Sequence, residues 1–326
     1  MTTRRDVLVV LTASAIIAPL VGSAQAPTSR RRIAVIAAVS LARQPLASLV
    51  ESLRELGYVE GRNIEFDPPV QNAEFAAFAQ MAARAVERKP DIIVSYGATA
   101  TVATRNATKS IPIVMVIGSD PVQLGLVKSL GRPDGNLTGI ALELQALAGK
   151  RIELIKEVIP SMHRLAVLWN SAGAAQATNM RLVEQEAKRA GVSVLGVEVR
   201  SRADFEAAAL ALSKLKADAM LIVPSSFFNG LGDRILQLEA SLKLPTMHGG
   251  PSAVRAGGLM SYTPDLNEDF HRAAVYVDKI LKGARPSELP IEQPTKFNLV
   301  VNLKTARALG LKIPQSILIR ANEVIE

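Results

Sequence analysis

Small polar residues and single acids follow several apolar runs of this sequence. In an open α/β sheet, ligands bind beyond the carboxyl ends of the strands, so these turns are where contacts to a solute are expected. Hydroxyl and amide side chains hydrogen-bond to small molecules, and an Asp carboxylate can hold an ammonium group. The candidate ligand-binding residues are Ser40, Tyr96, Gly97, Thr99, Ser119, Asp120, Asn170, Ser225 and Asp265.

The turn from Ser95 to Thr99 leads into a helical pattern through small residues. The first N–H groups of a helix have no partner within it, so this turn could bind a carboxylate or another anion. The structural alternative is that Tyr96 packs at the sheet edge and that Thr99 is an ordinary helix-start residue. Both interpretations are compatible with the residues.

Asp120 and Asp265 are the candidates for holding an ammonium group. Asp120 stands before Pro121 and Asp265 stands before a helical pattern, so either carboxylate could instead cap a turn or a helix. If Asp120 held the ammonium group, Asp120→Asn would weaken the binding of an amine by more than about tenfold.

Motifs of common enzymes and cofactor sites are absent from the sequence. There is no dinucleotide fingerprint after a strand, no phosphate-binding P-loop and no Gly-x-Ser-x-Gly elbow. His163, His248 and His271 lack the spacing of metal ligands on a helix. The chain has no Cys, which excludes thiol catalysis, Cys-ligated zinc and lipid attachment through an N-terminal Cys. We therefore expect a binding protein without cofactor or metal, not an enzyme.

The composition is that of a globular chain with room for about two domains. Of 326 residues, 48% are apolar and 21% charged, which excludes a disordered chain and permits a sizeable core. The net charge of +8 is spread along the chain without a long basic run, and aromatic residues make up only 4%. Nucleic acid is therefore not an expected partner.

The first 26 residues have the pattern of a secretory signal peptide. Arg4 and Arg5 precede the mostly apolar run Val7–Val21, and Ala24-Gln25-Ala26 fits a cleavage site. The paired arginines also fit a twin-arginine export signal. The run is shorter than the roughly 20 apolar residues of a membrane span, although an uncleaved anchor is the alternative. We expect a periplasmic mature chain without stable membrane insertion, not a lipoprotein.

Apolar runs and helical patterns alternate along the rest of the chain. Short apolar runs are typical of buried parallel strands, and apolar residues three or four positions apart are typical of the helices that cover them. The first series has strands at 33–37, 64–66, 91–95 and 113–117, and helices at 45–56, about 75–88 and 98–108. The second series has strands at 164–169, 193–199, 219–223 and 244–247, and helices at 175–190, 205–215 and 235–242.

This repetition predicts an α/β protein of two Rossmann-like, doubly wound lobes joined by hinge crossings. The segment 135–149 is the expected first crossing, followed later by a strand at 258–262, a helix at 267–281, a proline-rich crossing and a strand at 297–301. We expect residues 1–26 as the cleaved signal peptide, 27–140 with about 262–288 as the N-terminal lobe, and 141–261 with about 289–326 as the C-terminal lobe.

Several motifs, spread over nearly the whole mature chain, are similar to motifs of a known protein family. Together they resemble the substrate-binding proteins of ABC transporters, most closely the subfamily with members that bind tryptophan and other aromatic amino acids. The motifs are Leu53–Ile64 (LRELGYVEGRNI), Ile111–Val114, Asp120–Val122, Gly135–Gly139 (GNLTG), Ala256–Tyr262 (AGGLMSY), Leu289–Phe297 (LPIEQPTKF) and Asn302–Ala306 (NLKTA).

The resemblance implies a type I periplasmic-binding fold with three crossings, and delivery of the solute to the transmembrane subunits of an ABC permease. It places most of the candidate residues above in a cleft between the lobes. Two segments depart from the family pattern: Ala38–Pro45 is shorter than the usual family loop there, and Phe66–Val70 departs from the basic and aromatic residues that are common after the second strand. We expect a monomer that captures an amino acid or a related carboxylated compound by hinge closure.

Two other functions fit a secreted two-lobe chain. A sensor would present the same solute to a membrane receptor, and a neighbouring kinase gene instead of permease genes would favour it. A secreted enzyme would turn its ligand over. A cytoplasmic transcription regulator is disfavoured, because the signal-peptide pattern stands where its helix-turn-helix domain would be.

Overall fold

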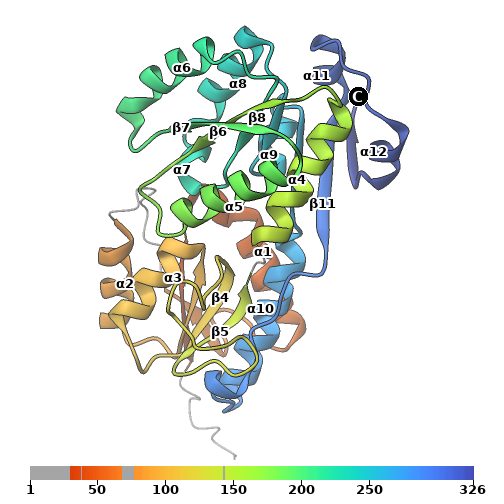
Figure 1. Cartoon of the computed structure of the whole chain (residues 1–326). Coiled ribbons are helices and arrows are strands. Elements are labelled where there is room, and N and C mark those ends of the chain that lie inside the picture. Colours follow the sequence, from red (N-terminus) through yellow and green to blue (C-terminus); the bar gives the residue numbers. More distant parts are fainter. Residues whose placement is uncertain (1–29, 38, 68–76, 142–143) are drawn as a thin grey trace, which may run out of the picture.

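The strands of the computed structural model, which describes residues 30–37, 39–67, 77–141 and 144–326, form two separate sheets (Figure 1). We call each sheet, together with the helices packed on it, a lobe. The N lobe contains the five-stranded sheet and the C lobe the seven-stranded sheet. The mixed α/β architecture of two largely parallel lobes confirms the predicted fold class.

The N-lobe sheet is parallel throughout, with the strand order β2-β1-β3-β4-β5. Its central strands are almost continuous apolar runs whose side chains are buried on both faces, as parallel strands between two helix layers require. The strands are β1 (Arg31–Ile36), β2 (Ile64–Phe66), β3 (Ile92–Tyr96), β4 (Ile113–Gly118) and β5 (Leu137–Ala141).

Four helices cover this sheet, and one of them comes from far along the chain. Helix α10 (Leu266–Leu281) packs against α1 (Val39–Glu55) and against β3, β4 and β5, with Phe270 and Val277 in the apolar core between them. The Tyr58 hydroxyl, just beyond the end of α1, donates to Asp278 of α10 and secures this contact. Helices α2 (Ala77–Glu87) and α3 (Ala98–Ala107) pack against each other, over a second apolar cluster.

The C-lobe sheet has the order β12-β11-β10-β9-β8-β6-β7. All neighbouring strands are parallel except β10 and β11, which pair antiparallel with Tyr262 opposite Leu299. The strands are β6 (Arg164–Trp169), β7 (Ser193–Glu198), β8 (Ala219–Ile222), β9 (Thr246–His248), β10 (Met260–Pro264), β11 (Phe297–Asn302) and β12 (Glu323–Ile325).

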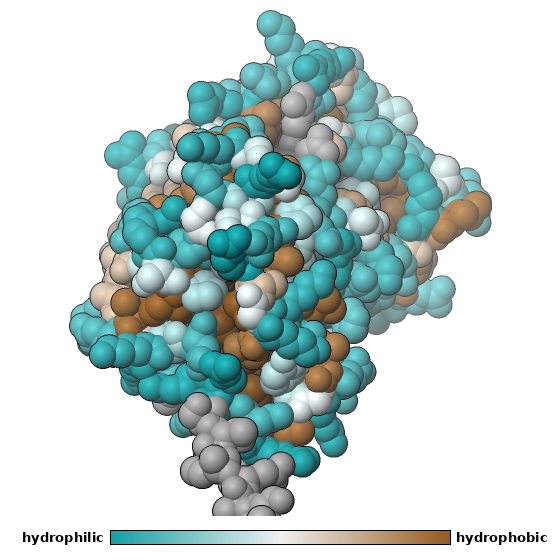
Figure 2. Space-filling view, turned by 90° about the horizontal axis from the view of Figure 1, so that it is seen from below, coloured by the Kyte–Doolittle hydropathy of each residue, from teal (hydrophilic) through white to brown (hydrophobic). Residues whose placement is uncertain are grey.

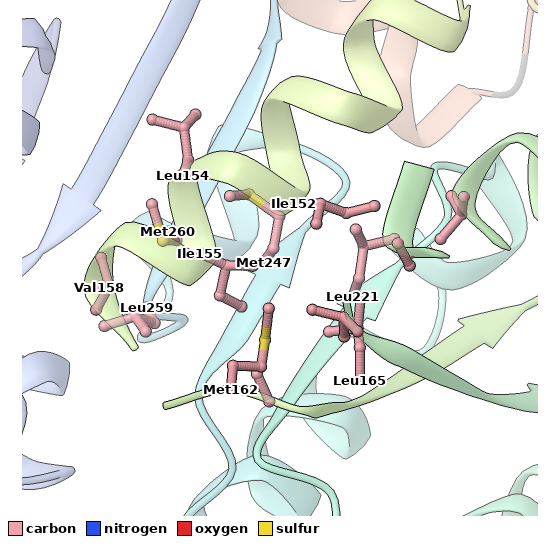
Figure 3. Close-up of a cluster of buried hydrophobic side chains, with 14 of the residues drawn as sticks. Ile152, Leu154, Ile155, Val158, Met162, Leu165, Leu221, Met247, Leu259 and Met260 are labelled. Carbon is pink, nitrogen blue, oxygen red and sulfur yellow. The ribbon is translucent and has the colours of Figure 1, made fainter. Parts of the chain in front are cut away.

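Helices also cover both faces of this sheet. On one face, α4 and α5 lie over the largest apolar cluster of the described residues, in which Ile152 and Ile155 meet Leu221 and Met247 (Figure 3). Such burial contributes roughly 25 cal/mol per Å² of apolar surface removed from water. The helices are α4 (Leu144–Val158), α5 (Gln176–Arg189), α6 (Phe205–Lys214), α7 (Ser226–Asn229), α8 (Gly232–Leu242), α9 (Pro251–Arg255), α11 (Leu303–Ala308) and α12 (Gln315–Arg320).

The chain passes between the lobes after β5, after β10 and before β11, and these passages support one another. The Ala141 N–H donates to the carbonyl of Glu292, and the Glu292 N–H donates to the carbonyl of Gly139. The Asp265 N–H donates to the carbonyl of Lys296. The second and third passages therefore run side by side, and α10 begins at that place.

The face of the molecule that is seen from below is mainly polar. Figure 2 views the molecule from below, and hydrophilic residues cover most of the face it shows, with apolar residues between them. Among the described residues, no helix combines the length and apolar character that a membrane span requires.

Two sequence predictions differ from the structure. Helix α1 begins at Val39, so Pro45 lies within it and does not open it, and Ser40 lies in its first turn rather than in a loop. The segment 135–149 is not simply a crossing, because it contains β5 and the start of α4. Strand β5 holds Thr138 and Gly139 and so lacks a continuous apolar run, although all five of its residues are buried.

We expect Gly139→Ala to destabilise the protein by about 3 kcal/mol, measured by chemical denaturation. Gly139 pairs with Met115 and has a φ of +129°. A Cβ there would lie 2.1 Å from the Met115 carbonyl oxygen, so both the backbone and the β4–β5 ladder would be strained. Gly131→Ala, with open space around its Cβ, is the control and should change stability by less than about 0.5 kcal/mol. Equal effects of the two substitutions would contradict this account of β5.

Candidate ligand-binding site between the lobes

The turns that follow strands of one sheet contact the turns that follow strands of the other. The Ala174 N–H, in the loop after β6, donates to Oγ1 of Thr99, at the start of α3, over 3.4 Å. Helix α7, which follows β8, packs against α1, which follows β1. The carboxyl ends of both sheets therefore face the boundary between the lobes, which is where a ligand of an open α/β sheet binds.

Tyr96 and Asp269 lie together on the N-lobe side of this boundary. Tyr96 is the last residue of β3, and its ring packs against that of Phe270, 5.7 Å away between centroids. Asp269 lies in the first turns of α10, one residue before Phe270, and its side chain is almost completely buried. The pKa of the Tyr96 phenol is raised to about 12, mainly by burial and to a lesser extent by the negative charge of Asp269.

The carboxylate of Asp269 lacks the partners that a buried charge needs. Its Oδ2 atom is enclosed and has no hydrogen-bond partner among the described residues. Burial, together with the nearby carboxylates of Asp265 and Glu268, raises the pKa of Asp269 to about 7, and only Arg272 opposes the shift. A carboxylic acid in this state is poised to ionise when a cation comes beside it.

The start of α3 supplies the opposite polarity next to Tyr96. Gly97 precedes the helix with a φ of +89°, and no side chain caps the helix. Thr101 is the first residue of α3 whose backbone N–H donates a hydrogen bond, and its acceptor is the Gly97 carbonyl. The N–H groups of residues 98–100 therefore have no hydrogen-bond partner among the described residues, and the positive end of the helix dipole favours an anion there.

Asp120 and Asp265 use their carboxylates within the protein. Asp120 accepts hydrogen bonds from the N–H groups of Val122 and Gln123 and closes a turn. Asp265 is the N-cap of α10 and accepts from the N–H groups at positions 267 and 268. These are the structural alternatives that the sequence left open, and they make both residues weaker candidates for holding an ammonium group.

Three more candidates are also engaged or enclosed. Asn170 is fully buried, and its amide donates to the carbonyls of Val199 and Arg200, which joins the end of β6 to the segment after β7. Ser225 caps the short helix α7, and Ser119 is buried. The side chain of Ser40 lies outside the described residues. Tyr96, Gly97 and Thr99 are the candidates that the structure brings together at the boundary.

Asp269 is not among the candidate residues predicted from the sequence, although a signal for it exists. Asp269 shares one helix face with Ala273, Tyr276 and Val277, all of which are buried. An acid on the apolar face of an amphipathic helix is costly to bury, so it marks a site that needs a partner. Among the described residues, no group of three or more acids and histidines is arranged to hold a metal ion.

Comparisons with known proteins identify chains that are similar to this one. A family model described as ABC transporter substrate binding protein matches residues 32–325. A tyrosine-binding protein of Clostridioides difficile is 24% identical over 263 residues, which cover 81% of this chain and 75% of that protein.

Two solved structures are also similar to this chain in sequence and fold. A domain from Streptococcus pneumonia in complex with L-Trp is 26% identical, has a TM-score of 0.84, and the match covers 91% of this chain and 100% of that one. A conserved domain protein from Vibrio cholerae is 28% identical with a TM-score of 0.82, and the match covers 90% and 99% of the two chains.

We expect Asp269→Asn to stabilise the ligand-free protein by about 2 kcal/mol at pH 8, measured by chemical denaturation. The pKa of Asp269 is raised from 3.8 to about 7, so the folded state holds more protons than the unfolded state between these pH values. The stability of the unsubstituted protein therefore falls as the pH rises through this window, and the gain from Asn should shrink at pH 5.

Asp134→Asn is the control, for which we expect the opposite change in stability. The N–H of Lys128 donates to the exposed Asp134 carboxylate and lowers its pKa, so this substitution should lower stability at pH 8. A stability difference between Asp269→Asn and the unsubstituted protein that is the same at pH 5 and pH 8 would contradict the buried, unpaired carboxylate.

Proposed function

This chain belongs to the family of ABC transporter substrate-binding proteins, and we propose that it captures a free amino acid between its two lobes for an ABC importer. One observation carries the choice of an amino acid. The buried Asp269 carboxylate lacks a partner and lies beside Tyr96, which is followed directly by the open N–H groups at the start of α3. A site with a negative and a positive end suits a zwitterion.

In this proposal each end of the solute meets the opposite charge. The ammonium group binds Asp269 through charge-assisted hydrogen bonds, which are about twice as strong as neutral ones. The carboxylate binds the N–H groups of residues 98–100, which belong to a rigid helix and need no rearrangement. The Tyr96 hydroxyl makes no hydrogen bond to any described residue and is the third polar group available to the solute.

The relatives support the same solute class. One relative is a tyrosine-binding protein and another was solved with L-Trp, so amino acids are bound by chains of this fold and similar sequence. A neutral sugar would leave the Asp269 charge without a cation, which favours an amino acid over a carbohydrate.

Transport and location complete the proposal. The three passages between the lobes permit a hinge motion, and closure would exclude water around the bound charges. A monomer exported by its signal peptide would carry the solute through the periplasm to the permease and release it unchanged. Recovery of the same compound from the protein by mass spectrometry tests the absence of turnover.

We expect a thermal-shift screen of the chain 27–326 to give stabilisation by one or more of the twenty L-amino acids, because binding only to the native state raises the melting temperature. Asp269→Asn should weaken the binding of that amino acid more than about tenfold, through loss of the ammonium partner. Asp120→Asn is the matched control, since its carboxylate closes a turn, and should leave the affinity nearly unchanged. The reverse order of the two effects would assign the ammonium to Asp120.

We also expect the affinity for the amino acid to rise about tenfold between pH 6 and pH 8, measured by calorimetry. The ammonium needs an ionised carboxylate, and the pKa of Asp269 near 7 leaves it largely protonated at pH 6. Binding should release a proton near pH 6, so the observed heat should depend on the ionisation enthalpy of the buffer. An affinity that is flat from pH 6 to pH 8 would argue against Asp269 as the ammonium partner.

A further inference from the structure

Arg151, in the middle of α4, is a buried cation for which the fold supplies no counter-ion. Its side chain is 5% exposed, and its Nε donates to the backbone carbonyl of Tyr262 over 2.8 Å. No carboxylate among the described residues forms an ion pair with it. Its two terminal nitrogens make no hydrogen bond to the described residues, and they are not among the fully enclosed unpaired atoms. They therefore retain an open side.

The place of this guanidinium follows from the register of the C-lobe sheet. The ladder between β9 and β10 ends with His248 opposite Ser261. Tyr262 is the next residue of β10, so its carbonyl stands just beyond the end of β9. By binding that carbonyl, Arg151 lies at the carboxyl edge of the C-lobe sheet, which is the edge that faces the boundary between the lobes.

The helix that carries Arg151 is held firmly. Ile152 and Ile155 of α4 are packed among Leu221, Met247 and other buried side chains of the C-lobe core (Figure 3). The backbone from which the guanidinium extends is therefore fixed by a well-packed helix. Burial lowers the pKa of Arg151 to about 10, which still leaves it charged at neutral pH.

We infer that Arg151 binds the carboxylate of the solute from the C lobe. This inference rests on the proposed function and adds a second contact to the same group. A carboxylate has about four lone-pair sites, so it can accept from the N–H groups of α3 in the N lobe and from a guanidinium of the C lobe together. The solute then supplies the anion that Arg151 lacks and the cation that Asp269 lacks.

Two consequences define the solute class and the coupling to closure. The solute must be a free, zwitterionic amino acid, because an amide leaves Arg151 unpaired and a carboxylic acid without the amine leaves Asp269 unpaired. The carboxylate would also link the two lobes directly, so full closure would require it.

Calorimetry with the twenty L-amino acids and their carboxamides tests the inference. The preference for the acid over its amide should exceed about 50-fold in the unsubstituted protein and fall at least about tenfold in Arg151→Gln, because the charge-assisted bonds are lost. Arg151→Lys keeps the charge without the planar fork and should give an intermediate preference. Melting curves of both variants establish that they are folded.

Arg105→Gln is the matched control. Arg105 is also an arginine with buried, unpaired nitrogens, but it lies in the last turn of α3, away from the start of that helix. The acid-to-amide preference should be unchanged in this variant.

Three results would overturn the inference. An equal affinity of the unsubstituted protein for an amino acid and its carboxamide would do so without any substitution. If Arg151→Gln and Arg151→Lys kept the acid-to-amide preference of the unsubstituted protein, Arg151 would not be a ligand-binding residue, while the proposed function would stand. Absence of binding to all twenty amino acids would overturn the proposed function, and the inference with it.

Discussion

A charged group that is removed from water needs a partner, and this constraint determines what can bind at the boundary between the lobes. Asp269 in the N lobe and Arg151 in the C lobe are both buried, and neither has an ion-pair partner among the described residues. A protein that was selected for stability alone would replace or pair such groups. Under the proposed function a zwitterionic solute would complete both, so that the cost of burial in the free protein would become selectivity for the ligand.

The passages between the lobes position these groups. The chain leaves β10 and begins α10 within a few residues, and the segment before β11 runs beside it through the hydrogen bond from Asp265 to Lys296. Arg151 holds the carbonyl of Tyr262 on one side of this passage, and Asp269 lies in the first turns of α10 on the other. The two charges therefore lie on helices next to the passages that would bend during closure. Under the proposed function this arrangement would link recognition of the solute to the hinge without a separate signal.

The sequence predicted the fold much better than the site. Alternating strands and helices follow directly from the periodicity of apolar residues, and most boundaries agree within a few residues. Strand β5 was missed because Thr138 and Gly139 interrupt its apolar run. Contacts within the fold explain why these two residues stand there: the Thr138 hydroxyl donates to the Leu289 carbonyl, and Gly139 lies against Met115. Asp120 and Asp265 looked like ligand residues because capping and ligand binding use the same side chains. Asp269 and Arg151 gain their importance from long-range burial, which local spacing does not reveal.

The most direct test of the account is a crystal structure of the chain 27–326 with the amino acid that binds most tightly. We expect the ammonium group within hydrogen-bond distance of the Asp269 carboxylate, and the carboxylate between the N–H groups of residues 98–100 and the Arg151 guanidinium. The two lobes would be closed around the solute. A solute bound away from Asp269, or with its carboxylate and ammonium exchanged, would contradict the central claim that these two buried charges select the ligand.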